Sequence, residues 1–112
     1  MEVAANESDR RKGLMFRTKM KESHGMIFLF PDERINSFWM KNTILSLDML
    51  FVSSDFRVVG IVHSVPPQNE VSRKVDTPSQ YVIEFGAGVA KKFGIVEGSR
   101  VLVHGTLARV DH

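Results

Sequence analysis

SFWMKNT at residues 37–43 and LDMLFV close behind it at residues 47–52 are the stretches that decide the fold. Together they hold the only tryptophan, a lysine, an amide and an aspartate among residues otherwise typical of a protein core. The second stretch is an apolar run broken once, by Asp48, which is typical of a buried strand. Polar groups are costly to bury without partners, so this mixture suggests a functional role as well as a structural one.

Working outward, two further apolar runs predict strands. Residues 26–30 (MIFLF) lie between Gly25 and Pro31, as expected of a short strand buried on both faces. A polar turn at residues 53–55 leads from the strand at 48–52 into residues 56–62, and this arrangement predicts a β-hairpin.

Residues 81–85 (YVIEF) alternate in the manner of a half-buried strand. Tyr81, Ile83 and Phe85 are expected on one face, with Glu84 on the other. Glu84 is therefore a carboxylate among strong strand-forming residues.

Short helices are expected at two places. Asn6 or Ser8 can cap a helix that runs to about residue 12, and Gly13 can end it in a left-handed conformation. Residues 89–93 can form about one further turn of helix, which follows a glycine-rich break.

With strands also expected at residues 2–4 and 100–110, the chain offers about six or seven short strands and two helical turns. This pattern predicts a mainly β fold, a single antiparallel sandwich or jelly-roll-like barrel with one or two short helices. We expect one domain over residues 1–112. Because the strand at residues 2–4 starts abruptly, we also expect signal or leading-strand residues upstream of it in the natural chain.

The composition excludes several classes of protein. At 112 residues, with 43% hydrophobic and 25% charged residues, the chain resembles an ordinary globular domain. Fifteen Lys and Arg against 13 Asp and Glu give a net charge of +2, and the basic run at residues 10–12 is interpreted as solvated surface. We therefore expect no nucleic-acid partner. The absence of cysteine excludes a disulfide scaffold, and no stretch is long and apolar enough to span a membrane.

Five short motifs follow one another in a fixed order: GLM at 13–15, GMIF at 25–28, FWMKNT at 38–43, LD at 47–48 and VIE at 82–84. In this order and spacing, the chain resembles the prokaryotic family named Domain of Unknown Function 192 over residues 3–103. The FWMKNT hexapeptide is the most specific part of the resemblance.

The resemblance implies a mainly β, jelly-roll-like domain found in bacteria and archaea, often behind a signal or membrane-anchor sequence. It therefore implies a periplasmic or otherwise exported location. The resemblance brings no established activity, and it adds more to the prediction of the fold than to the prediction of the function.

Several polar residues near the hexapeptide are candidates for ligand binding: Trp39, Lys41, Asn42, Glu84 and Arg17. In a strand, Trp39 and Lys41 point to one face and Asn42 to the other. An exposed tryptophan beside a lysine and an acid suits a small polar ligand, either sugar-like or peptide-like. In the alternative interpretation, Trp39 belongs to the core and Asp48 forms a structural ion pair with Lys41 or Arg17.

Two other functions stay open. Asp48 and Glu84 are the candidate catalytic residues of a hydrolase, provided that they flank one bond. Either acid can instead be a hydrogen-bonded latch on a neighbouring loop. The long polar segment at residues 68–80 is the candidate surface of an interaction module.

No metal or cofactor is expected. The histidines lie on separate elements, without a close metal-ligand spacing: His24, His63, His104 and His112. Three methionines lie within the motifs and would suit Cu(I), but filling of the core is their more common use: Met15, Met26 and Met40. The sequence does not indicate an oligomeric state.

Overall fold

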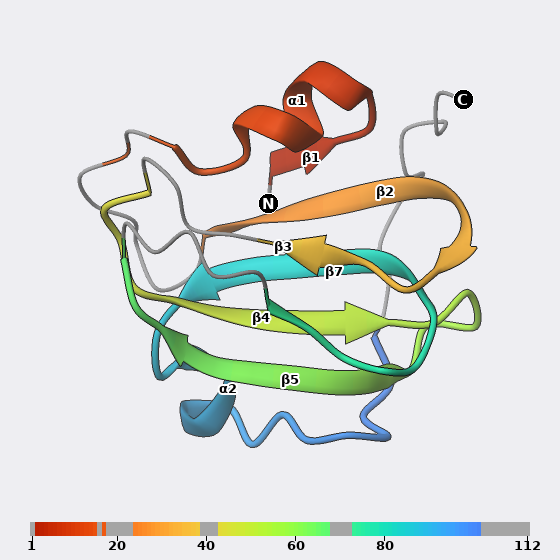
Figure 1. Cartoon of the computed structure of the whole chain (residues 1–112). Coiled ribbons are helices and arrows are strands. Elements are labelled where there is room, and N and C mark those ends of the chain that lie inside the picture. Colours follow the sequence, from red (N-terminus) through yellow and green to blue (C-terminus); the bar gives the residue numbers. More distant parts are fainter. Residues whose placement is uncertain (1, 16, 18–23, 39–42, 68–72, 102–112) are drawn as a thin grey trace.

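A five-stranded sheet forms the centre of the protein (Figure 1). The computed structural model of the chain describes residues 2–15, 17, 24–38, 43–67 and 73–101. The strands of the sheet follow the order β1-β2-β7-β4-β5, with bounds β1 (Glu2–Ala4), β2 (Gly25–Arg34), β7 (Ser79–Gly86), β4 (Leu47–Val52) and β5 (Val58–Val65). The β1–β2 pair is parallel and the other three pairs are antiparallel.

Smaller elements surround this sheet. A two-stranded sheet is formed by β3 (Ser37–Phe38) and β6 (Arg73–Lys74), which are antiparallel. The helices in the described part of the chain are α1 (Glu7–Lys12) and α2 (Val89–Lys92). Figure 1 shows α1 beside the edge formed by β1 and β2, and α2 below β5 at the opposite end of the sheet.

The prediction of a mainly β domain with one or two short helices is confirmed. The sheet is mixed rather than wholly antiparallel, because β1 runs parallel to β2. It is also not a closed barrel, since β1 and β5 are its outer strands and do not pair with each other within the described residues. The parallel pair follows from the path of the chain, which passes through α1 before it enters β2.

Helix α1 has the expected signals at its ends. The Asn6 side chain accepts a hydrogen bond of 2.8 Å from the backbone N–H of Asp9, as an N-cap does. Gly13 follows the helix with φ of +48°, and a Cβ atom there would lie 3.2 Å from the Phe28 ring. Glycine therefore both ends the helix and lets the chain pass close to β2.

The predicted hairpin of β4 and β5 is also confirmed. The Ser53 backbone N–H donates to the Arg57 carbonyl at 2.9 Å, and Phe56 adopts φ of +62° in the turn. Strand β2 differs from the expectation, because it continues past Pro31 to Arg34. Its pairing with β7 is irregular between Leu29 and Arg34, as a proline without an N–H requires.

The two faces of the sheet bury separate apolar clusters. The first, here called the Glu84 face, is built from Ala4, Leu14, Met26, Phe28, Leu47, Met49, Phe51, Val65 and Val82. The second, the Asp48 face, is built from Ile27, Leu29, Leu50, Val52, Val58, Ile83, Phe85 and Ala90. Each face is named after the acid that it carries, as the strand register shows. The predicted alternation along residues 81–85 is confirmed by this division.

Different segments cover the two faces. On the Glu84 face, Phe38 of β3 and Val75, next to β6, pack against the cluster. A Cβ atom at Gly60 would lie 2.4 Å from a methyl carbon of Val75, so glycine is what allows this approach. On the Asp48 face, Ala90 of α2 is buried in the cluster, and Ile95 packs against it.

The strand expected at residues 100–110 can be followed only at its start. Arg100 forms a single bridge with Arg57, and the Val101 N–H donates to the Phe56 carbonyl at 2.7 Å. Residues from 102 onward lie outside the described part of the chain.

Candidate functional site

Glu84 is a buried acid that forms no hydrogen bond or ion pair with any described residue. It lies toward the end of β7, directly opposite Met26 of β2 and Met49 of β4. Only 4% of its surface is exposed. Most buried polar groups in proteins are hydrogen-bonded, so this carboxyl group needs an explanation.

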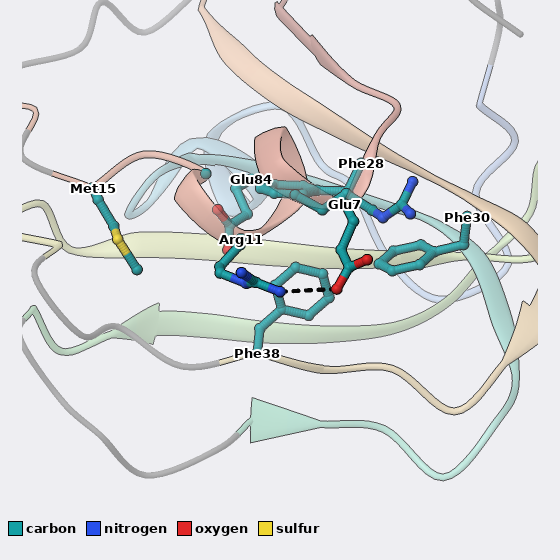
Figure 2. A pocket seen from close by; sticks show the side chains of 9 residues that line it. Glu7, Arg11, Met15, Phe28, Phe30, Phe38 and Glu84 are labelled. Atoms are coloured by element: carbon teal, nitrogen blue, oxygen red, sulfur yellow. Dashed lines mark hydrogen bonds and ion pairs between the residues drawn. The ribbon is translucent and has the colours of Figure 1, made fainter. Parts of the chain in front are cut away.

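A cavity of about 300 Å³ opens beside Glu84 (Figure 2). Its lining comes from α1, the turn that follows α1, and strands β2, β3 and β7: Glu7, Arg10, Arg11, Gly13, Met15, Phe28, Phe30, Phe38 and Glu84. The cavity is therefore the place where the Glu84 carboxyl group can meet a partner from outside the protein.

Burial raises the pKa of Glu84 from its ordinary value of 4.5 to about 8. The cause is desolvation, because the charged form loses its hydration without gaining a partner. At neutral pH the group is then mainly a neutral carboxylic acid, which can donate a hydrogen bond as well as accept one.

Among the described residues, the charged side chains that line the cavity with Glu84 all belong to α1. Arg11 forms an ion pair of 2.8 Å with Glu7, one helical turn earlier, and both side chains are exposed. Figure 2 shows this pair at the cavity. Since exposed pairs of this kind contribute little, both side chains remain available to a ligand.

Arg10 attaches α1 to the sheet at the edge of the cavity. Its guanidinium group donates hydrogen bonds of 2.8 Å to the carbonyls of Ala5 and Leu29. It also lies 5.3 Å from the centre of the Phe30 ring, in a cation–π contact. Along one edge of β2, Leu29 pairs with Tyr81 of β7. Along the other edge, the short strand β1 has already ended, and Arg10 binds the sheet there.

Phe38 is the first residue of the FWMKNT hexapeptide, and it closes the cavity from the side of β3. Its ring meets the rings of Phe28 and Phe51 edge to face, with centroids 5.1 and 6.2 Å apart. Phe38 therefore faces the core. The candidates Trp39, Lys41 and Asn42 lie outside the described residues, as does Met40, and their roles stay predictions.

Asp48, by contrast, is a hydrogen-bonded latch. It is fully buried, and its carboxylate accepts hydrogen bonds from three backbone N–H groups. They belong to Ser64 at 2.8 Å and to Gly88 and Ala90 at 3.0 Å each. One carboxylate thus holds β5 and the first turn of α2 to β4, which is the latch that the sequence left open as an alternative.

Asp48 and Glu84 point to opposite faces of the sheet. Across the β4–β7 pair, Asp48 lies opposite Phe85 and Glu84 lies opposite Met49. Directly paired residues share a face, and consecutive residues alternate. The structure therefore does not bring the two candidate catalytic acids together, and they cannot flank one bond.

Arg17 is paired with Glu2 rather than with Asp48. The Arg17 guanidinium group donates to both carboxylate oxygens of Glu2, at the partly exposed start of β1. The hydrogen bond from Arg17 lowers the pKa of Glu2. Arg17 is not among the residues that line the Glu84 cavity.

The candidate interaction segment at residues 68–80 is partly built into the fold. Its described part contains β6, and Ser79, at the start of β7, is fully buried. Asn36 donates hydrogen bonds of 3.0 Å to the carbonyl and the hydroxyl of Ser79. Residues 68–72 lie outside the described residues.

A second cavity, of about 480 Å³, lies on the Asp48 side of the molecule, next to α2. Its lining includes His63, Ser64, Lys91 and Ile95. His63 and Lys91 are exposed and keep their hydration, so this cavity lacks the buried, unpartnered group that distinguishes the first.

Other kinds of site can be addressed only where the structure describes the chain. Across residues 2–15, 17, 24–38, 43–67 and 73–101, no group of three His, Cys, Asp or Glu side chains is placed to hold a metal ion. In the same ranges, no helix has the length and apolar character needed to cross a bilayer.

Sequence reasoning identified Glu84 but missed the α1 residues above it. Arg11 and Lys12 are exposed, as the interpretation of residues 10–12 as solvated surface predicts, but Arg10 and Arg11 also line the cavity. A usable signal was present, because Glu7, Arg10 and Arg11 recur at three- and four-residue spacing and so share one side of a helix.

Comparisons with other proteins agree with this architecture. A family model, that of Domain of Unknown Function 192, described as "Uncharacterized ACR", matches residues 1–103. No curated protein matches the chain.

Two crystal structures are similar. One is of a proposed transcription regulator from Sinorhizobium meliloti 1021, with 41% identity and a TM-score of 0.86 over 88% of this chain and 77% of that one. The other is of a protein of unknown function from Novosphingobium aromaticivorans DSM 12444, with 37% identity and a TM-score of 0.86 over 88% of this chain and 71% of that one.

Proposed function

The chain belongs to the family Domain of Unknown Function 192, and from that premise we propose that it is a non-catalytic domain of the cell envelope that binds a small polar ligand. The binding site is the cavity around Glu84. The family itself has no assigned activity, so the proposal depends on the geometry of this cavity.

The observation that carries the proposal is the carboxyl group of Glu84, which is buried, faces a cavity, and has no hydrogen-bond partner among the described residues. Among the described residues, no side-chain nitrogen or oxygen atom that is sealed from solvent lacks a hydrogen-bond partner, so the Glu84 oxygens reach the cavity. A ligand that hydrogen-bonds to Glu84 there gains a polar contact that no described residue supplies.

The size and lining of the cavity fit a small molecule. Ligand pockets usually begin at about 300 Å³ and combine apolar walls with a few polar groups. Here the rings of Phe28, Phe30 and Phe38 form apolar walls, and the polar groups come from Glu84 and α1. The adjoining hexapeptide residues Trp39, Lys41 and Asn42 are proposed to complete the site.

Binding is favoured over hydrolysis because the second candidate acid is engaged elsewhere. Asp48 is held by three backbone N–H groups on the other face of the sheet. The name of the Sinorhizobium meliloti neighbour does not change the proposal. The net charge of the chain is only +2, and Arg11 is paired with Glu7. For these reasons we still expect no nucleic-acid partner.

The location in the cell envelope rests on the resemblance stated from the sequence. It is tested by fractionating cells that express the full natural gene product, followed by immunoblotting. Recovery with a periplasmic marker supports the proposal, and recovery with a cytosolic marker contradicts it.

Ligand binding is tested by NMR, with a panel of sugars, amino acids, short peptides and small carboxylic acids added to ¹⁵N-labelled protein. We expect at least one compound to shift the amide signals of Phe28, Phe38 and Glu84. The signals of Gly88 and Ala90, on the opposite face, should move little.

Two tryptophan variants provide the control. Met15→Trp places a larger side chain in the cavity lining and should weaken binding at least tenfold. Ile35→Trp adds the same ring at a position that is 49% exposed and outside the lining, so it should leave binding unchanged. Equal effects of the two variants, or shifts confined to Gly88 and Ala90, would contradict the assignment of the cavity.

A further inference from the structure

We propose that the ligand of the Glu84 cavity presents a hydrogen-bond acceptor oxygen, that of a carboxylate or an amide carbonyl, on a small apolar body. This inference rests on the proposed function and names the ligand class for the same site. Within the earlier alternatives, it favours a peptide-like ligand over a sugar-like one.

The first argument is the hydrogen-bonding capacity of Glu84. Because its pKa lies at about 8, the group carries a proton at neutral pH, and that proton has no acceptor among the described residues. A ligand that offers an acceptor oxygen fits this group as it stands. A cationic ligand would form an ion pair with the group only after the group loses its proton.

The second argument is the charge around the cavity. Of the described charged side chains in its lining, Arg10 and Arg11 are positive and Glu7 is negative, which leaves one net positive charge among them while Glu84 is neutral. The described residues that face Glu84 from β2 and β4 are Met26 and Met49, which are uncharged. The field in the cavity therefore favours an anion or a carbonyl dipole and disfavours a cation.

The third argument is the shape and chemistry of the walls. Phe28 and Phe38 meet edge to face, and together with Met15 they offer apolar surface to the body of the ligand. An apolar cavity of about 150 Å³ is enough for a benzene ring. The volume here, about 300 Å³, leaves room for a ring and a polar head group.

The test uses three probes that share a phenyl ring: benzoate, benzamide and benzyltrimethylammonium. Their charges stay constant between pH 6 and 9, so a change in affinity reports on the protein. Dissociation constants are measured by NMR titration of the unmodified protein. We expect benzoate and benzamide to bind at pH 7, and the cation to bind at least tenfold more weakly. Affinity for benzoate should fall about tenfold from pH 7 to pH 9, as Glu84 loses its proton.

Variants at Glu84 distinguish the effect of its hydrogen-bond donation from the effect of its charge. Glu84→Gln keeps a donor, so its affinity for benzoate should stay within about threefold of the wild type at pH 7 and lose its pH dependence. Glu84→Met removes the donor and should lose at least tenfold. Glu97→Gln, the same change at an exposed position away from the cavity, should have no effect. The pH titration of the wild type tests the inference even if a variant fails to fold.

The possible results are distinguishable. If the cation binds best, with an affinity that rises with pH and disappears in Glu84→Gln, the acceptor-ligand inference is wrong and the proposed function stands. If the probes fail but other compounds of the panel bind in the cavity, the inference again fails alone. If nothing binds in the cavity, both fail. A preference for benzoate over benzamide would identify a carboxylate as the acceptor. A preference for benzamide would identify an amide carbonyl.

Discussion

The two faces of the β4–β7 pair each bury one carboxyl group, and the two groups differ in their hydrogen bonds. Asp48 is fully buried and accepts three backbone hydrogen bonds. Glu84, one register position away, is almost as buried and has no partner among the described residues. Burial alone therefore does not indicate what an acid does in this protein.

The partners of each acid decide its role. The three N–H groups bound by Asp48 belong to β5, α2 and the residue before α2, so this acid joins chain segments that are distant in sequence. Glu84 joins nothing within the described residues and faces a cavity. A satisfied acid stabilises the fold, whereas an unsatisfied acid beside a cavity indicates a site for a ligand.

The strongest test of this comparison is the pH dependence of stability. Because the pKa of Glu84 is 4.5 in the unfolded chain and about 8 in the fold, the folded state retains a proton that the unfolded state has lost. This contribution to stability is fully present below pH 4.5, and it is lost as the pH rises to about 8. The loss is roughly 5 kcal/mol.

Glu84→Gln should remove this dependence. Urea unfolding at several pH values between 4 and 9 should show the free energy of unfolding of the wild type falling relative to that of the variant. Parallel curves for the two proteins would mean that Glu84 has the same pKa in the folded and the unfolded chain, and the contrast between the two acids would then disappear.

The next largest effect is expected at Asp48. Asp48→Ala leaves three backbone N–H groups, one buried and two partly buried, without an acceptor, which should cost about 3–4 kcal/mol in the free energy of unfolding. Urea unfolding at pH 5 measures this loss. The matched variant, Glu84→Ala, breaks no described hydrogen bond and should cost less at the same pH. A larger loss for Glu84→Ala would reverse the roles of the two acids.

A smaller effect is expected for the cover of the Glu84 face. Phe38→Ala removes a half-buried ring that meets Phe28 and Phe51, and should cost about 2 kcal/mol. It should also open the cavity to water and so bring the pKa of Glu84 down toward 4.5. Carboxyl ¹³C NMR of Glu84 across the titration measures this shift. An unchanged pKa would show that Phe38 does not keep water from Glu84.

The smallest effect is expected for the exposed pair of Glu2 and Arg17. Glu2→Gln should cost roughly 0.5 kcal/mol, because solvent screens a partly exposed ion pair. Urea unfolding in low and high salt checks both the size of the loss and its screening. A loss as large as that of Asp48→Ala would show that the pair holds β1 to the rest of the protein.

Local features of the fold were predictable from particular residues. Asn6 and Gly13 marked the ends of α1, and the alternation around Glu84 assigned β7 and its two faces. These signals act over a few residues, where capping groups and the period of a strand are set by covalent geometry. The continuation of β2 past Pro31 was missed, because tertiary pairing overrode the local preference for a break.

The candidate site was predictable only in part. Glu84 stood out as an acid in an apolar strand, but the pairing of Asp48 with Glu84 was not supported. The pairing of two strands decides which of their residues share a face. The register of β4 against β7 cannot be derived from the positions of the two strands in the sequence. The same limit applies to Arg17, whose partner is Glu2 rather than Asp48.

By itself, the sequence determined the family, the mainly β class and the positions of most strands and of both helices. Short motifs and hydrophobic periodicity depend only on residues that are close together in the sequence. Only the tertiary structure decided that α1 lies over Glu84, since the parallel pairing of β1 with β2 carries residues 7–11 close to Glu84, which is more than 70 positions away in sequence. It also decided that Asp48 is a latch and Glu84 is not. The reason is physical: the cost of burying a carboxyl group depends on the groups that surround it, and those groups come from distant parts of the chain.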